Sequence, residues 1–212
     1  MPKKSHDLDK LLATDTVAAA RALLGAELCR RHADGRVVRF RICETEAYDG
    51  FEDRVSHASR AKTARNEPMF GPARVWYVYL CYGMHEMLNL VTREADYPAA
   101  ILIRGALELD TDGNVVRRVD GPGRLTKALD VHRKDFNERP DMETTGLWVS
   151  SGIVVPDAEV SRTPRIGVAY AGPEWAPMPW RFVCKPVTWS SRDSAAWPAA
   201  RRRAGVRAKA SQ

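Results

Sequence analysis

The segment Arg36–Tyr48 constrains the fold most, because its side chains alternate in polarity as they do on a β-strand. Successive side chains of a strand point to opposite faces, so residues two apart share a face. One face of this segment begins with apolar residues and continues with two acids: Phe40, Ile42, Glu44, Glu46 and Tyr48. The other face carries Arg39, Arg41, Cys43, Thr45 and Ala47. The alternation therefore predicts a strand with two carboxylates on its apolar face.

Two carboxylates on an apolar face need a physical reason. Burying a carboxylate costs several kcal/mol, roughly, unless it is paired or hydrogen-bonded. One explanation is a pair of buried salt bridges to Arg104 or Arg41. The other is a desolvated general base, since burial beside an aromatic side chain is what such a group needs. The spacing is compatible with both explanations.

The rest of the chain predicts a single α+β domain in which strands outnumber helices. A helix is expected over Thr16–Leu24, between the capping residue Asp15 and Gly25, and a second helix from Gly121 to about Val131. Besides Arg36–Tyr48, the expected strands are Ala26–Arg31, Arg74–Tyr82, His85–Thr92, Ala99–Arg104, Leu147–Val155, Arg165–Tyr170 and Arg181–Cys184. Between them, Asp49–Gly71 is polar and without sustained period, which is typical of a functional loop.

The predicted hairpin at Gly83 is rich in tyrosine. Strand alternation puts Tyr77 and Tyr79 on one face and Tyr82 on the other, at the turn. Aromatic residues in strands are most often core residues. A large aromatic at a hairpin tip has little to pack against, so Tyr82 is also a candidate wedge between DNA base steps.

Charge and composition exclude several classes of protein. The net charge of +6 is consistent with a polyanionic partner, and much of the excess lies in the tail that contains Arg201, Arg202, Arg203, Arg207 and Lys209. No apolar run is long enough for a membrane span and no secretory signal is recognisable, so a cytoplasmic protein is expected. The four cysteines are widely spaced, which favours reduced, mostly buried thiols.

Two motifs are rejected or left open. His85-Glu86-Met87-Leu88-Asn89 begins like the HExxH zinc motif but ends in asparagine on a predicted strand, so it does not predict a metal site. Gly121-Pro122-Gly123 precedes a helix with Arg124 and Lys127 in its first two turns. The segment is compatible with phosphate binding or with a plain loop-to-helix joint, but its spacing excludes a nucleotide-triphosphate loop.

An ordered series of segments then carries a resemblance that covers most of the chain, from the first helix to about Trp189. The segments are Arg41–Tyr48, Glu52-Asp53, Ser56-His57, Arg65-Asn66, Met69-Phe70, Tyr77–Met84 with Asn89, Ile101–Glu108, Gly121–Leu129, Arg165–Val168 and Pro179–Phe182. Together they resemble the alkyladenine (3-methyladenine) DNA glycosylase family. The resemblance implies one α+β domain, here residues 1–196, around a curved antiparallel sheet with flanking helices and a protruding hairpin. Residues 197–212 form a basic tail outside it, expected to be disordered.

The resemblance also implies an activity and a site. The activity is monofunctional: extrusion of an alkylated or deaminated purine from duplex DNA and hydrolysis of its N-glycosidic bond, by a monomer without metal or cofactor. Glu46 is then the general base and Arg104 its positioning partner. Tyr48, His57, Tyr79 and Asn89 line the base pocket, and Tyr82 is the intercalating wedge. Contacts with the DNA backbone are expected from Thr63, Arg65, Arg124 and Lys127.

The sequence departs from the family pattern at two places, and two other functions are compatible with it. His85 stands where family members often carry an aromatic residue, and the basic tail has no counterpart in the family. A non-catalytic nucleic-acid binder would use the same hairpin and basic face. A sugar hydrolase would use Glu44 and Glu46, about 7 Å apart along a strand, as paired acids, but the positive charge makes it the less favoured reading.

Overall fold

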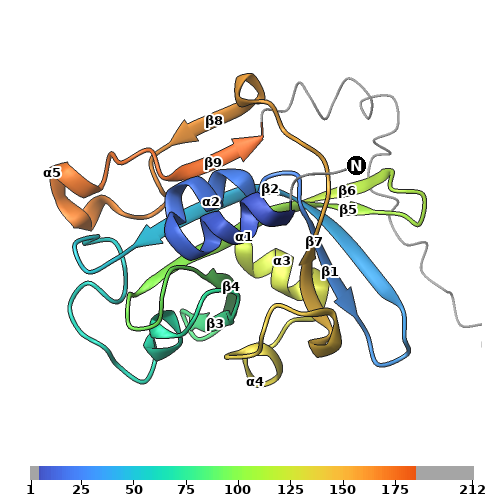
Figure 1. The fold of residues 1–212 in the computed structure, drawn as a ribbon, viewed down its shortest axis with the longest axis horizontal. Helices are drawn as coiled ribbons and strands as arrows, with labels where there is room; N and C mark the ends of the chain where they lie inside the picture. The colour runs from blue at the N-terminus through green and yellow to red at the C-terminus, as the bar shows by residue number, and fades with distance from the viewer. Residues whose placement is uncertain (1–4, 185–212) are drawn as a thin grey trace, which may run out of the picture.

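Two long antiparallel strands, β2 (Val37–Asp49) and β5 (Ala99–Leu109), organise the fold (Figure 1). Each strand changes its outer neighbour halfway along. The first half of β2 pairs with β1 (Glu27–Arg31), and its residues 44–46 pair with β9 (Arg181–Cys184). Residues 100–102 of β5 pair with β4 (His85–Val91), and residues 105–109 with β6 (Val115–Asp120). The centre of the β2–β5 pair is thus a branch point of the sheet.

The remaining strands extend the sheet from these neighbours. β3 (Trp76–Cys81) pairs with β4, β7 (Leu147–Ser150) with β1, and β8 (Val160–Thr163) with β9. The computed structural model describes residues 5–184, and within them the nine strands form one antiparallel sheet. The predicted α+β class and antiparallel sheet are confirmed. None of the helices formed by these residues is long and apolar enough to cross a membrane.

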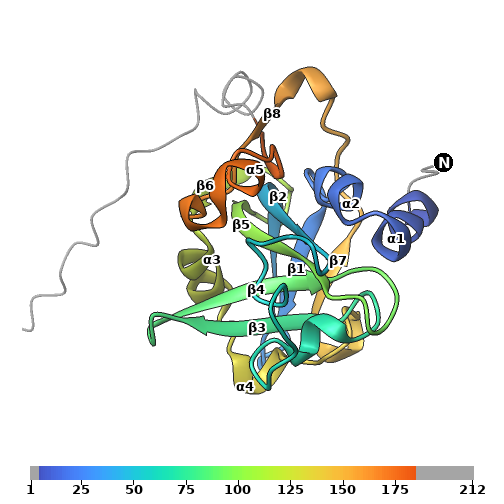
Figure 2. The ribbon, with the colours of Figure 1, turned by 90° about the vertical axis from the view of Figure 1, so that its left-hand side faces the viewer.

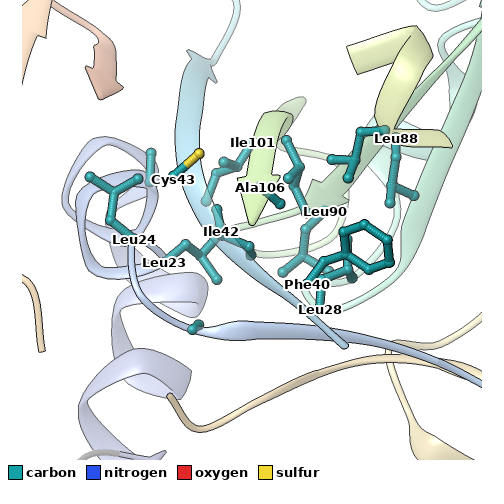
Figure 3. Close-up of a cluster of buried hydrophobic side chains, with 14 of the residues drawn as sticks. Leu23, Leu24, Leu28, Phe40, Ile42, Cys43, Leu88, Leu90, Ile101 and Ala106 are labelled. Carbon is teal, nitrogen blue, oxygen red and sulfur yellow. The ribbon is translucent and has the colours of Figure 1, made fainter. Parts of the chain in front are cut away.

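The helices pack mainly on one face of the sheet. They are α1 (Ser5–Thr14), α2 (Thr16–Ala22), α3 (Pro122–Leu129), α4 (Arg133–Phe136) and α5 (Gly172–Trp175), with short 3₁₀ turns at Glu67–Phe70, Glu143–Thr145, Asp157–Glu159 and Ala169–Ala171. The main core lies between α1, α2, α3 and the sheet, where Leu23, Phe40, Ile42, Leu90 and Ile101 are fully or almost fully buried (Figure 3). Burial of this apolar surface is the dominant stabilising contribution.

The sequence explains how α2 and α3 begin and end. The side chain of Asp15 accepts a hydrogen bond from the amide of Ala18 at 2.9 Å and caps α2, as predicted. Helix α3 has Pro122 in its first turn, where the missing N–H costs nothing. Asp130, in a left-handed conformation, ends it.

The hairpin β3–β4 projects from the body of the domain (Figure 2). Trp76, Val78, Leu88 and Leu90 lie on its core face, and the side chains that alternate with them face away from the helices. Among the latter are Tyr77, Tyr79, Met87 and Asn89. The predicted protruding hairpin is therefore confirmed, and it offers a row of polar and aromatic groups on the sheet face opposite the main core.

Several predicted elements differ from the structure. Arg165–Tyr170 is not a strand but a turn followed by a 3₁₀ helix, because Gly167 takes a left-handed conformation (φ 76°) and the amide of Ile166 bonds to a side chain rather than to a strand. The strand predicted over Leu147–Val155 ends at Ser150. Helix α1 and strands β6 and β8 were not predicted. Cys29, Cys43 and Cys184 are buried, whereas Cys81 near the hairpin tip is half-buried. The predicted boundary at residue 196 lies outside the described residues.

Candidate active site

A β-bulge at Cys43 changes which face of β2 is apolar. Ile42 pairs with Ala106 of β5, but Glu44 pairs with Gly105 and Thr45 with Ile103, so Cys43 has no partner across the strand. Phe40 and Ile42, before the bulge, lie in the main core, and so do Cys43 at the bulge and Ala47 after it. The expectation that Glu44 and Glu46 share a face with Phe40 and Ile42 is therefore wrong. A bulge shifts alternation by one residue, and it turns both acids toward the opposite face.

Glu46 is fully buried there and is held by three donors. The hydroxyl of Tyr48 donates to its Oε2 at 2.7 Å, and the main-chain N–H of Ile166 donates to its Oε1 at 2.8 Å. The guanidinium of Arg104 donates to Oε2 over a longer distance, 3.3 Å. The carboxylate is thus partly compensated, with one oxygen contacted by a single donor.

Glu44 connects Arg104 to a second arginine. Arg104 Nε donates to Oε1 of Glu44 at 3.0 Å, and Arg181 Nε donates to the same oxygen at 2.7 Å. Arg104 therefore bridges the two acids. Of the two salt-bridge partners considered from the sequence, Arg104 is the one found. Arg41 instead lies 3.7 Å from Glu27. Arg181, on β9, was not predicted, because it is distant in sequence and reaches Glu44 only through the β2–β9 pairing.

A pocket of about 230 Å³ lies beside the residues that bond to Glu46. Its lining includes all four predicted pocket residues, Tyr48, His57, Tyr79 and Asn89, together with Val55, Met69, Tyr77, Tyr82, Ile166, Gly167, Val168 and Tyr170. Glu46 itself is not among the lining residues, but Tyr48 and Ile166, which contact its two oxygens, are. The volume is below the range of about 300–1,000 Å³ typical of drug-sized ligands and suits one flat heterocycle.

Aromatic side chains dominate one wall of the pocket. The rings of Tyr77 and Tyr79 lie 5.3 Å apart, and the His57 ring meets Tyr79 edge-on at 4.9 Å. The amide nitrogen of Asn89, which is buried, donates to the carbonyl oxygens of Tyr77 and Met87 at 3.0 and 3.1 Å, which fixes the orientation of this side chain. The pocket is therefore largely preformed.

Burial sets the protonation state of these aromatic groups. It raises the pKa of Tyr77 to about 12, and burial together with Glu46 holds the pKa of Tyr48 well above its usual value. Burial, and then the charge of Arg65, lowers the pKa of His57. At neutral pH the tyrosines are therefore protonated donors and His57 is uncharged.

A buried ion pair fixes the wall that carries Ile166. Arg165 forms two hydrogen bonds with the carboxylate of Asp53, at 2.6 and 2.8 Å, and donates to the carbonyl of Ala47 at 2.8 Å. Its guanidinium also lies 5.0 Å from the ring centres of both Tyr48 and Trp180. The pair ties the loop after β2 to the segment that presents the Ile166 amide to Glu46. The sequence contained both residues in the family resemblance but gave no signal that they meet.

Tyr82 stands at the mouth of the pocket. It is 89 % exposed at the hairpin tip, with a left-handed backbone conformation (φ 50°), and it contributes to the same pocket lining as Tyr77 and Tyr79. The expectation from alternation that Tyr82 falls on the other face is therefore wrong, because the left-handed turn interrupts the strand geometry. Met84 beside it is 72 % exposed.

The four residues expected at the DNA backbone occupy two places. Thr63 and Arg65 lie in the loop after β2, where Arg65 is 5.4 Å from the ring centre of Tyr79 and donates to the carbonyl of Leu80. Arg124 and Lys127 are exposed on α3. This helix touches the hairpin close to its turn: Thr126 donates to the carbonyl of Glu86 at 2.9 Å, and His85 packs so closely on Gly123 that a Cβ there would lie 3.0 Å away. Both places flank the hairpin. Within residues 5–184, no group of three or more His, Cys, Asp and Glu side chains is arranged to hold a metal ion.

Comparison with known proteins agrees with this geometry. The sequence model described as "Methylpurine-DNA glycosylase (MPG)" matches residues 10–187. A protein of Myxococcus xanthus (strain DK1622) is 45% identical over 174 residues, which cover 82% of this chain and 87% of the relative. A protein of Anaeromyxobacter dehalogenans (strain 2CP-C) is 43% identical over 181 residues, 85% of this chain and 84% of the relative.

Both relatives carry the name "Putative 3-methyladenine DNA glycosylase". A third protein with this name, from Methanocella arvoryzae (strain DSM 22066 / NBRC 105507 / MRE50), is 42% identical over 180 residues, 80% of this chain and 88% of the relative. These matches favour neither a non-catalytic binder nor a sugar hydrolase. The chain belongs to the methylpurine-DNA glycosylase family and is a monofunctional DNA glycosylase of base excision repair.

Proposed function

We propose that the protein extrudes alkylated or deaminated purines, of the 3-methyladenine, 7-methylguanine and hypoxanthine type, from duplex DNA and hydrolyses their N-glycosidic bond. The observation that carries the proposal is the place of Glu46, a fully buried carboxylate directly behind the wall of a base-sized aromatic pocket. A desolvated carboxylate in a cleft is a candidate general base.

The contacts of Glu46 indicate which atom takes the proton. Oε2 already accepts from Tyr48 and Arg104, whereas Oε1 accepts only from the Ile166 amide. Each carboxylate oxygen has about two acceptor positions, so Oε1 retains one for a water molecule. In the proposed step this water gives a proton to Oε1 while its oxygen bonds to C1′ of the sugar. The C1′–N bond breaks, its electron pair leaves with the purine, and an abasic site remains.

The pocket favours a damaged base for electrostatic and steric reasons. A purine alkylated at N3 or N7 is cationic, and stacking on Tyr48 and Tyr79 favours a cation over a neutral base by ~0.5–2 kcal/mol. Such a base also leaves as a neutral molecule and needs little further help. Asn89, held rigidly by two carbonyls, opposes the 2-amino group of guanine. Extrusion costs less for a mispaired base, which adds discrimination.

The proposal assigns the remaining predicted residues to DNA. Tyr82 fills the gap left by the extruded nucleotide, and Thr63, Arg65, Arg124 and Lys127 contact phosphates on either side of the hairpin. We infer a monomer whose glycosylase domain is residues 1–196, followed by the basic tail 197–212, and a location in the cytoplasm, with the nucleoid if the source is bacterial.

The test is release of free base from duplex DNA by Glu46→Gln. A positioned general base contributes about 10²–10⁴-fold, so the single-turnover rate constant should fall by that factor while the affinity for lesion-containing duplex stays within a few-fold of wild type. A panel of duplexes with hypoxanthine, 7-methylguanine or etheno-adenine, each also in single-stranded form, identifies the lesion class. Undiminished release by Glu46→Gln would overturn the role of Glu46, and equal release from both forms would overturn extrusion from the duplex.

A further inference from the structure

A second, cationic hollow adjoins the base pocket. It has a volume of about 320 Å³ and is lined by Arg54, Val55, Ser56, His57, Ser59, Arg60 and Tyr170. Val55, His57 and Tyr170 line the base pocket as well. The two cavities therefore share a rim, and anything attached to a base in the pocket passes close to this hollow.

The charge of the hollow comes from two arginines with no carboxylate near them in the lining. Arg54 and Arg60 are exposed, and within residues 5–184 neither forms an ion pair, whereas most of the other arginines there do. The lining contains no Asp or Glu. His57 contributes hydrogen-bonding capacity but no charge at neutral pH, since its pKa is lowered. The hollow thus carries positive charge that no carboxylate of its own lining neutralises.

The backbone that presents the two arginines is firmly held. Asp53, Val55, Ser56 and Ala58 point inward and are almost completely buried. Asp53 accepts from the amide of Val55 at 3.1 Å, and the hydroxyl of Tyr170 donates to the carbonyl of Val55 at 3.0 Å. Inward residues therefore fix the loop, and a preformed site of this kind loses less entropy when it binds a ligand.

A neighbouring hollow shows where the cationic surface ends. Its lining shares four residues with the cationic hollow, namely Arg54, Ser59, Arg60 and Tyr170, but it also contains Glu52 and Glu174. These acids disfavour an anion on the side away from the base pocket. The part of the surface suited to an anion is consequently the part next to the pocket.

We propose that Arg54 and Arg60 form a phosphodiester subsite for the strand that carries the extruded nucleotide, at a phosphate directly flanking that nucleotide. The proposal rests on the proposed function, because it needs the damaged base to occupy the pocket. The phosphates nearest the shared rim then belong to the same strand as that base, and not to the complementary strand. Arginine suits this task because its planar fork of donors matches the oxygens of a phosphate.

The first test measures the affinity of the full chain for a duplex with a single tetrahydrofuran abasic site, over a range of salt concentrations. Arg54→Ala and Arg60→Ala should each weaken binding about tenfold and reduce the slope of log K against log salt by about one. The matched control is Arg36→Ala, which removes the same charge from the β1–β2 turn at the opposite end of the molecule (Figure 1). Arg54→Lys with Arg60→Lys should retain most of the salt slope.

The second test identifies the phosphate. A neutral methylphosphonate is placed at single positions of either strand, and binding by wild type is compared with Arg54→Ala/Arg60→Ala. At a position flanking the abasic site on its own strand, the losses from the methylphosphonate and from the variant should be strongly non-additive, because both remove the same contact. On the complementary strand the losses should add.

The proposal is overturned if Arg54→Ala/Arg60→Ala behaves like Arg36→Ala, or if the losses add at every position of the lesion strand. Non-additivity on the complementary strand alone would equally overturn it. Because this measurement is of binding, its outcome is independent of base release by Glu46→Gln. Failure of the phosphate subsite and failure of the proposed chemistry therefore give different results.

Discussion

Asp53 and Glu46 are both fully buried carboxylates that face an arginine, but their hydrogen bonding differs. The two oxygens of Asp53 receive two donors each: the two Arg165 nitrogens at 2.6 and 2.8 Å, and the amides of Asp49 and Val55 at 3.2 and 3.1 Å. Glu46 receives three donors, and its contact with Arg104 is long, at 3.3 Å. Arg165 serves one acid, whereas Arg104 is shared with Glu44.

This difference in hydrogen bonding explains why Asp53 is suited to a structural role and Glu46 to a reactive one. All acceptor positions of Asp53 are occupied, and its carboxylate holds the loop after β2 against the segment of Arg165. Glu46 keeps one acceptor position on the oxygen that only Ile166 contacts. A carboxylate that is stabilised but not saturated can still bind water and take up a proton.

The largest effect on folding is expected from Asp53→Asn. Breaking a buried ion pair leaves an uncompensated charge and costs about 3–5 kcal/mol, so the free energy of unfolding should fall by this amount in chemical denaturation. Glu46→Gln, which breaks a weaker contact with an arginine, should lose much less stability but almost all base release. Equal losses of stability in the two variants would contradict the contrast between a saturated and an unsaturated acid.

A smaller effect, on rate, is expected from Glu44→Gln. Without the negative charge of Glu44, we expect Arg104 to pair with Glu46 through both of its terminal nitrogens. The guanidinium would then occupy the acceptor position of Glu46 that we propose for the water molecule. The single-turnover rate of base release should fall about tenfold or more, as for other small displacements in active sites, with little change in DNA affinity.

Glu27→Gln is the matched control for this variant. Glu27 also lies between two arginines, Arg39 and Arg41, but on β1, away from the pocket. Its replacement should leave the rate unchanged. If the two variants slow base release equally, Glu44 contributes only to the stability of the sheet.

The smallest effect is expected from Tyr48→Phe, which removes one donor from Glu46 and keeps the aromatic ring. The net value of one hydrogen bond corresponds to about a two- to tenfold loss of rate. Because burial and Glu46 hold the pKa of Tyr48 well above 10, the hydroxyl remains protonated from neutral pH up to pH 10. The ratio of the wild-type rate to the variant rate should therefore stay constant over this range, and a ratio that declines toward pH 10 would show that Tyr48 ionises there.

The elements with regular patterns were predictable. Strand β2, the hairpin β3–β4 and helix α2 have clear alternation, turn or capping signals, and the structure has them close to their predicted bounds. The alternation of Ile166, Val168 and Tyr170 predicted a strand, but the left-handed conformation of Gly167 produces a turn instead. Strand β6 was missed because Val115-Val116-Arg117-Arg118 shows no alternation. Local pattern does not reveal which segments the sheet will pair.

The predicted pocket residues lie together in the structure, but strand alternation did not predict that they would. Tyr48, His57, Tyr79 and Asn89 do line one cavity, and the resemblance to a family had named them. Alternation alone put Glu44 and Glu46 on the core face, since a bulge such as that at Cys43 leaves no simple mark in the sequence. The partners Arg181, Ile166 and the Asp53–Arg165 pair come from segments more than 100 residues apart.

The sequence by itself determined the strand that carries Glu46, the tyrosine-rich hairpin and, through an ordered series of motifs, the family. Those features depend on side-chain periodicity and on residue identity, which are local. Tertiary structure alone decided that Glu46 keeps a free acceptor position while Asp53 keeps none. That distinction depends on which donors reach each oxygen, and the donors are brought there by the bulge in β2, the pairing of β2 with β9 and the turn at Gly167.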